Sequence, residues 1–186
     1  MPGKTAACQF LLVALLTSVA GAPWATCQSS ATSEVTLDEA RAQNFTVTAL
    51  DGKPLDLAAL LIQDKPVLLH FWATWCAPCR KEMPHFAELS HRYKEQGLTV
   101  VGLSIDDPQT DGLKVKEFIA AAKANYAIAY ASQATYKFFD RGNRVALPRV
   151  FLFRSNGELY RRFGRYSWGT NRAIGDAVKE LMAQAH

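Results

Sequence analysis

Cysteine is scarce in this chain, which has four cysteines among 186 residues. Cys8 and Cys27 lie in or beside an apolar N-terminal segment, so only Cys76 and Cys79 fall in the part of the sequence that we expect to fold. A disulfide between residues so close in sequence closes almost no loop and removes little chain entropy. We therefore expect the value of this pair to be chemical rather than structural.

A second Cys-x-x-Cys motif and a histidine cluster are also missing. Structural zinc sites usually have four ligands, and His85 and His91 are six residues apart, on different faces of an expected helix. This argues against zinc, and we expect neither a metal nor a cofactor. Copper(I) delivery is the alternative function, because soft thiolates suit that ion. A static disulfide is a further alternative.

Charge is almost absent from the N-terminal segment, where Lys4 is the only charged residue before Glu34. The apolar run Phe10–Ala20 is well short of the roughly 20 residues that a membrane-spanning helix needs. Small residues follow it, and this order is typical of a secretory signal peptide. We therefore predict an exported protein with a signal peptide at residues 1–25, or alternatively an uncleaved membrane anchor.

The segment after the leader is small and polar, so we predict a flexible tether at residues 26–40 and one domain at residues 41–186. Cys27 is a candidate for lipidation, although Trp24-Ala25-Thr26 before it fits a lipobox poorly. The predicted location is periplasmic or otherwise exported, with membrane association through the leader or through a lipid on Cys27.

Hydrophobic periodicity predicts alternating strands and helices. The nearly continuous apolar run Pro66–Trp72 is typical of a strand covered on both faces. The other expected strands are 44–50 with a partner beginning at Leu55, 98–105, 128–130, and a hairpin of 149–153 with 159–163. The expected helices follow the cysteines up to Gly97, surround Val115–Ala122, span 134–139, and close the chain after a cap at Thr170. This order predicts an α/β fold in which a mixed sheet has helices on both faces.

The two cysteines fall at the expected junction of a strand and a helix. Unpaired N–H groups and the helix dipole favour a thiolate there, so we predict that Cys76 attacks a target disulfide. Cys79, one turn further on, then resolves the mixed disulfide. Pro78 has no N–H and fits the first helical turn. Trp75 would shield the sulfur and offer an apolar contact to a partner.

The string from Phe71 to Pro84 (FWATWCAPCRKEMP) resembles the TlpA/ResA-like branch of the thioredoxin family. The resemblance implies a thioredoxin fold, to which the expected strands at 44–50 and from Leu55 add an N-terminal β-hairpin extension. It further implies an exported thiol-disulfide oxidoreductase that acts on protein disulfides. It also implies reduction, with clients such as cytochrome c haem-binding cysteines or copper-site cysteines. The electron donor would be a membrane thiol transporter.

The same resemblance implies a cis-proline facing the cysteines, and Pro148 occupies that position. Relatives commonly have a small hydroxyl residue after this proline, so Arg149 is a departure. His70 is another departure, because thioredoxins carry a buried acid there and relatives in this branch often carry an amide. An imidazole could relay a proton to the inner cysteine, and the alternative is a packed, hydrogen-bonded histidine.

Charge is unevenly distributed, since residues 141–186 hold nine Lys or Arg and three acids. An acidic partner surface or membrane phosphates could be attracted to this region, although a solvated rim is the more common meaning. Nothing in the sequence indicates nucleic-acid recognition. A peroxidase would need a Pro-x-x-x-Thr-x-x-Cys setting, which Ala73-Thr74-Trp75-Cys76 does not supply.

Overall fold

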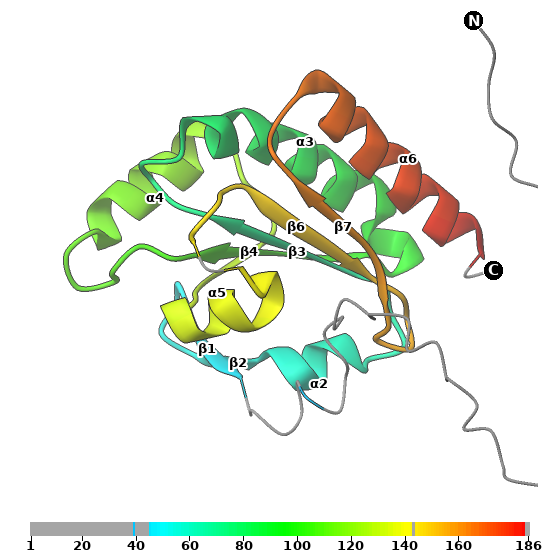
Figure 1. Ribbon diagram of the computed structural model, residues 1–186, viewed down its shortest axis with the longest axis horizontal. Coiled ribbons are helices and arrows are strands. Elements are labelled where there is room, and N and C mark those ends of the chain that lie inside the picture. The colour runs from blue at the N-terminus through cyan, green and yellow to red at the C-terminus, as the bar shows by residue number, and fades with distance from the viewer. Residues whose placement is uncertain (1–38, 40–44, 143, 185–186) are drawn as a thin grey trace, which may run out of the picture. The chain divides into compact units, whose positions relative to one another are not determined.

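The computed structural model describes residue 39 and residues 45–142 and 144–184. The predicted leader and Cys27 lie outside the described residues, as does the predicted tether apart from Glu39. In the described part, one sheet holds seven strands in the order β2-β1-β5-β4-β3-β6-β7 (Figure 1). The strands are β1 (Thr46–Ala49), β2 (Pro54–Asp56), β3 (Val67–Trp72), β4 (Thr99–Ser104), β5 (Ala127–Tyr130), β6 (Arg149–Phe153) and β7 (Leu159–Gly164).

Helices connect the strands and cover both faces of the sheet. They are α2 (Leu57–Leu61), α3 (Ala77–Tyr93) followed by a 3-10 turn η1 (Lys94–Gln96), α4 (Gly112–Ala121), α5 (Gln133–Asp140) and α6 (Trp168–Gln184). Strands β3, β4 and β5 are parallel neighbours, so right-handed crossovers place α3 and α4 on the same face. Helix α6 packs beside α3 on that face, and α2 and α5 cover the other (Figure 1).

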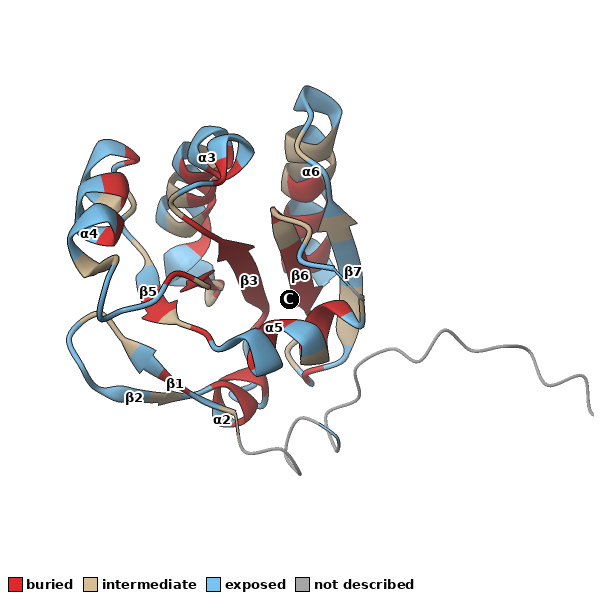
Figure 2. Ribbon diagram, turned by 60° about the vertical axis from the view of Figure 1, so that its left-hand side comes forward, coloured by how far each residue is buried: buried red, intermediate tan, exposed pale blue. Residues whose placement is uncertain are grey.

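The predicted mixed sheet and N-terminal hairpin extension are confirmed. β1 pairs with β2 and with β5, antiparallel to both, while β6 runs antiparallel to β3 and begins the predicted hairpin with β7. β3 lies between β4 and β6, and all six of its residues are buried (Figure 2). This explains why its sequence is an unbroken apolar run apart from His70.

Two local predictions were wrong or incomplete. The closing helix is capped by Ser167 rather than Thr170, because the Ser167 hydroxyl accepts a hydrogen bond from the Thr170 backbone N–H at 2.9 Å. Helix α2 was not predicted, since five residues are too few for a helical period. Asp56 initiates it by accepting from Ala58 N at 2.8 Å and Ala59 N at 3.0 Å. Gly97 ends the helical segment formed by α3 and η1, as predicted, and its backbone is left-handed with a φ of 98°.

Candidate active site

The two cysteines lie where β3 passes into α3, as predicted. Cys76 is the N-cap residue, with an extended backbone, and its Sγ accepts a hydrogen bond from the Cys79 backbone N–H at 3.2 Å. A disulfide joins the two residues, whose Cα atoms are 5.3 Å apart. Pro78 lies within the first turn of α3. N–H groups at this position stabilise negative charge on sulfur when the disulfide is reduced.

Burial distinguishes the two sulfur-bearing residues. Cys76 is 4% exposed and Cys79 is 0% exposed. Trp75, immediately before Cys76, is 66% exposed and is therefore available to a partner. A partner approaching from solvent meets Trp75 and Cys76 first, and Cys79 lies behind them.

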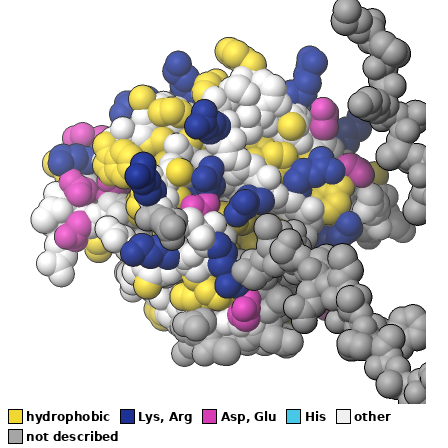
Figure 3. Space-filling view, viewed as in Figure 1, with side chains coloured by type: hydrophobic (Ala, Val, Ile, Leu, Met, Phe, Trp, Pro, Cys, Tyr) yellow, Lys and Arg dark blue, Asp and Glu magenta, His cyan; other side chains and the backbone are white. Residues whose placement is uncertain are grey.

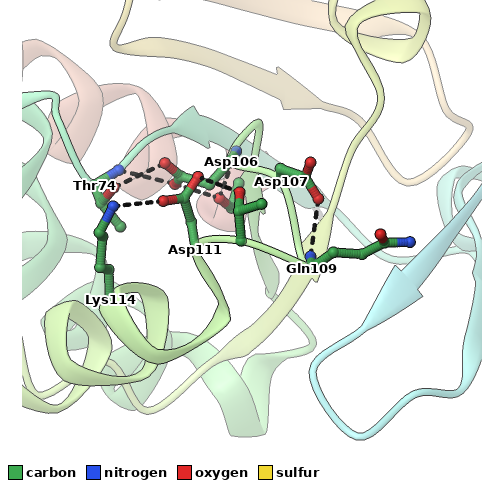
Figure 4. A network of polar contacts seen from close by, with 8 residues as sticks. Thr74, Asp106, Asp107, Gln109, Asp111 and Lys114 are labelled. Atoms are coloured by element: carbon green, nitrogen blue, oxygen red, sulfur yellow. Dashed lines mark hydrogen bonds and ion pairs between the residues drawn. The ribbon is translucent and has the colours of Figure 1, made fainter.

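The loop that carries Cys76 is anchored by Asp106, a residue that sequence reasoning missed. Its carboxylate accepts from the Thr74 backbone N–H at 2.9 Å, from the Thr74 hydroxyl at 2.8 Å and from the Ser104 hydroxyl at 2.7 Å (Figure 4). Asp106 follows the buried strand β4, so these bonds connect the ends of two neighbouring parallel strands. In the sequence, the position of Asp106 directly after an apolar strand is the feature that could have indicated a place near the cysteines.

The loop opposite the cysteines carries Pro148, and the Leu147–Pro148 peptide bond is cis, as predicted. The Leu147 side chain packs against the buried cluster that contains Cys76 and Cys79. On the other side, the Tyr136 hydroxyl accepts from Ala146 N at 2.9 Å and donates to Ala146 O at 3.1 Å. The proline loop is thus held between α5 and the cysteine helix.

Arg149, the residue that departs from the family pattern, is engaged within the domain. Its Nε lies 2.5 Å from Asp140 Oδ1, and Asp140 is buried at the end of α5. Arg162 also donates to the Asp140 backbone carbonyl at 3.2 Å. Part of the arginine excess near the C-terminus therefore connects α5 to β6 and β7 rather than facing a partner.

His70 lies on strand β3, beneath the cysteine helix α3. Its ring packs against Phe86 at a centroid distance of 4.4 Å, and its Nε2 is 3.6 Å from Glu82 Oε2. Both side chains are buried, and among the described residues neither has a hydrogen-bond partner. His70 is therefore packed, as the alternative in the sequence analysis had it, but within the described residues it is not hydrogen-bonded.

Burial shifts the two pKa values in opposite directions. It raises the pKa of Glu82 to about 8 and lowers the pKa of His70 to about 3, because a dry interior disfavours each charged form. The separation is short enough for an ion pair, but desolvation outweighs that attraction, so both groups are mainly neutral near pH 7. Glu82 was missed because a charged residue on a helix is normally assigned to solvent.

The described residues contain no group of three or more His, Cys, Asp or Glu side chains arranged to hold a metal ion. Within the same residues, no helix combines the length and the apolar character that crossing a membrane requires.

Of the two sulfur-bearing residues, only Cys76 keeps any exposure to solvent, and Cys79 is bonded to it from the fully buried side. Exchange of a disulfide between proteins requires this order of access. Fold and site together define the class of thioredoxin-fold thiol-disulfide oxidoreductases.

Comparison with known proteins agrees with this class. The AhpC/TSA family model matches residues 39–162. The thiol-disulfide oxidoreductase ResA of a Bacillus cereus strain is 34% identical over 148 residues, which is 76% of this chain and 72% of that protein. The ResA protein of Bacillus anthracis is 36% identical over 148 residues, which again cover 76% of this chain and 72% of that protein. The chain therefore belongs to the AhpC/TSA family and, within it, to the ResA-like thiol-disulfide oxidoreductases.

Solved structures support the fold. A secreted Mycobacterium tuberculosis disulfide oxidoreductase, described as homologous to Escherichia coli DsbE, has a TM-score of 0.62 at 22% identity, covering 76% of this chain and 98% of that chain. A thioredoxin family thiol:disulfide interchange protein from Chlorobium tepidum has a TM-score of 0.62 at 23% identity, with shares of 74% and 92%. The copper alternative finds no support among these relatives.

Proposed function

We propose that this protein is an exported reductant of protein disulfides, with Cys76 as the attacking residue and Cys79 as the resolving residue. The observation that carries the proposal is the unequal access to the two residues at the start of α3. The Cys76 thiolate attacks one sulfur of the client disulfide and releases the other as a thiolate. Cys79 then loses its proton and attacks the Cys76 sulfur, which frees the second client thiol. Two electrons pass to the client, and the Cys76–Cys79 disulfide forms.

His70 and Glu82 act as the proton relay behind Cys79 in this proposal. Glu82 lies three residues after Cys79 on α3, so both side chains are on the same face of the helix. Its raised pKa means that Glu82 can both hold and release a proton near neutral pH. Neutral His70, in contact with Glu82, can accept a proton at its unprotonated ring nitrogen only while the other nitrogen releases one, because burial disfavours the charged ring.

Partners and location follow from the leader and from the relatives. The apolar N-terminal run and the secreted Mycobacterium tuberculosis neighbour support export. In that compartment the Cys76–Cys79 disulfide must be reduced again by an external dithiol, which is oxidised in turn, and we propose a membrane thiol transporter as that donor. The proposed clients are exported proteins that need free cysteines, such as those of cytochrome c maturation or copper-site assembly.

The test is a trapping experiment. The Cys79→Ser variant is expected to retain clients on Cys76 as mixed disulfides, because the resolving thiol is missing, and mass spectrometry would identify them. The Cys76→Ser variant is the matched control and should trap few or none. Equal recovery from both variants, or from neither, would contradict the assigned roles.

A further inference from the structure

Two grooves flank the start of the cysteine helix α3. The α4 groove, of about 540 Å³, lies between α3 and α4 and is lined in part by Trp75, Arg80 and Phe118. The α6 groove, of about 590 Å³, lies between α3 and α6 and is lined in part by Lys81, Trp168 and Arg172. Either groove could receive the chain of a client whose cysteine is bonded to Cys76.

The α6 groove opens at the end of the sheet where the cysteines lie. Lys81 is two residues after Cys79 on α3. Gly164, the last residue of β7, pairs with Arg149, which follows the cis-proline. The chain then passes through Tyr166, which lines the groove, to the start of α6 at Trp168. A segment extending from a client cysteine therefore needs only a few residues to reach it.

Charge distinguishes the two grooves. In the α4 groove, Lys114 is paired with Asp111 at 2.8 Å and the Arg80 guanidinium lies 4.5 Å from the centre of the Phe118 ring. Three acids line this groove, namely Asp106, Asp111 and Glu117. An acidic segment would therefore be repelled there.

In the α6 groove, the acid Glu88 is already paired with Arg92. Lys81 and Arg172 make no ion pair with any of the described residues, so their charges face outward. Figure 3 shows Lys and Arg side chains spread over one face of the molecule, with hydrophobic, Asp and Glu side chains among them. An acidic segment would therefore be attracted to this side of α3.

Trp168 adds an apolar anchor to the α6 groove. It is 84% exposed, the highest value among the large hydrophobic side chains of the described residues. Tryptophan contributes more binding energy than most residues when a partner covers it, because its large ring loses contact with water. A segment that covered Trp168 would gain that burial and the two cationic contacts together.

We propose that the α6 groove binds an acidic, extended segment of the client protein that flanks its disulfide and carries an apolar side chain over Trp168. This inference rests on the proposed function and adds a substrate class to it. The α4 groove disfavours the same segment.

The test uses synthetic disulfide peptides that are identical except for an acidic, neutral or basic flank. Their reduction by the reduced full-length protein is followed by quenched flow and chromatography. At low salt the acidic peptide is expected to react about tenfold faster than the basic one, and the difference should shrink at about 0.5 M salt. The uncharged reagent 4,4′-dithiodipyridine reports exchange that does not use either groove.

Two variants locate the preference in the α6 groove. Arg172→Glu is expected to reduce the acidic-to-basic rate ratio about fivefold, whereas Lys116→Glu, the same charge reversal on the exposed side of α4, should leave it nearly unchanged. Trp168→Ala is expected to slow all three peptides about fivefold, whereas Leu113→Ala, which also truncates an exposed apolar side chain, should not.

The outcomes separate the two proposals. Equal rates for the three peptides, with a normal dithiodipyridine reaction, would contradict the proposed binding of an acidic segment in the α6 groove. The proposed reductant function would then still stand. Equal effects of Arg172→Glu and Lys116→Glu would also overturn the groove, because net charge alone would explain them. Failure of the unaltered protein to react with dithiodipyridine would instead contradict the reductant function.

Discussion

Glu82 should make the stability of the oxidised domain fall as the pH rises above neutrality. Burial raises its pKa from the usual 4.5 to about 8, so the folded state holds a proton that the unfolded state has already lost. The resulting stability is fully present below pH 4.5 and is lost as the pH rises through 8. Between about pH 6 and about pH 8.5 the loss amounts to about 2 to 3 kcal/mol, at roughly 1.4 kcal/mol for each pH unit of proton difference.

His70 produces the opposite dependence at acid pH. Its pKa is lowered from 6.5 to about 3, so its stability is present above pH 6.5 and is lost as the pH falls through 3. Between 4.5 and 6.5 the two effects cancel, because folding binds one proton at Glu82 and excludes one at His70. The free energy of unfolding is therefore expected to be constant between pH 4.5 and pH 6.5 and to fall on either side of that interval.

The assay is urea unfolding of the oxidised protein at a series of pH values. Glu82→Gln keeps the size of the side chain but does not titrate, so the decline between about pH 6 and about pH 8.5 should become shallower by about 2 to 3 kcal/mol. Glu88→Gln is the matched control, since Glu88 is an exposed acid on the same helix. Parallel curves for Glu82→Gln and the unaltered protein would refute a raised pKa at Glu82.

Two further substitutions test the site. His70→Ala is expected to slow turnover and alter its pH profile if His70 belongs to the proton relay, and an unchanged profile would remove it from the mechanism. Asp106→Ala leaves the Thr74 N–H, the Thr74 hydroxyl and the Ser104 hydroxyl without their acceptor. It should therefore lower the free energy of unfolding by about 3 kcal/mol in a urea titration, and a loss within experimental error would show that the loop is held by other contacts.

Much of the fold could be predicted because single segments carried strong local signals. The apolar run of β3 indicated a strand covered on both faces, and Ser155-Asn156-Gly157-Glu158 indicated the turn between β6 and β7. Gly157 has a φ of 80°, which a turn of this kind requires. Patterns of this sort act over a few residues, so one sequence suffices to find them.

The missed features depend on contacts between distant segments. Glu82 is buried only because α3 packs over His70, and Asp106 is useful only because β3 and β4 end side by side. Arg149 is only a departure from the family pattern in the sequence, and its role in the domain depends on Asp140 at the end of α5. In the sequence, such charged residues look like ordinary surface residues. Only the packing of distant segments shows that they are buried or paired.

The two sides of the site have separate supports: Asp106 holds the cysteine loop to β4, whereas Tyr136 holds the loop before Pro148 to α5. No residue belongs to both sets of bonds. A substitution that breaks one set of bonds therefore leaves the other set in place. The two sides meet through the apolar contact of Leu147 with the cysteine cluster, so that contact is where a change on the proline side would reach the sulfur atoms.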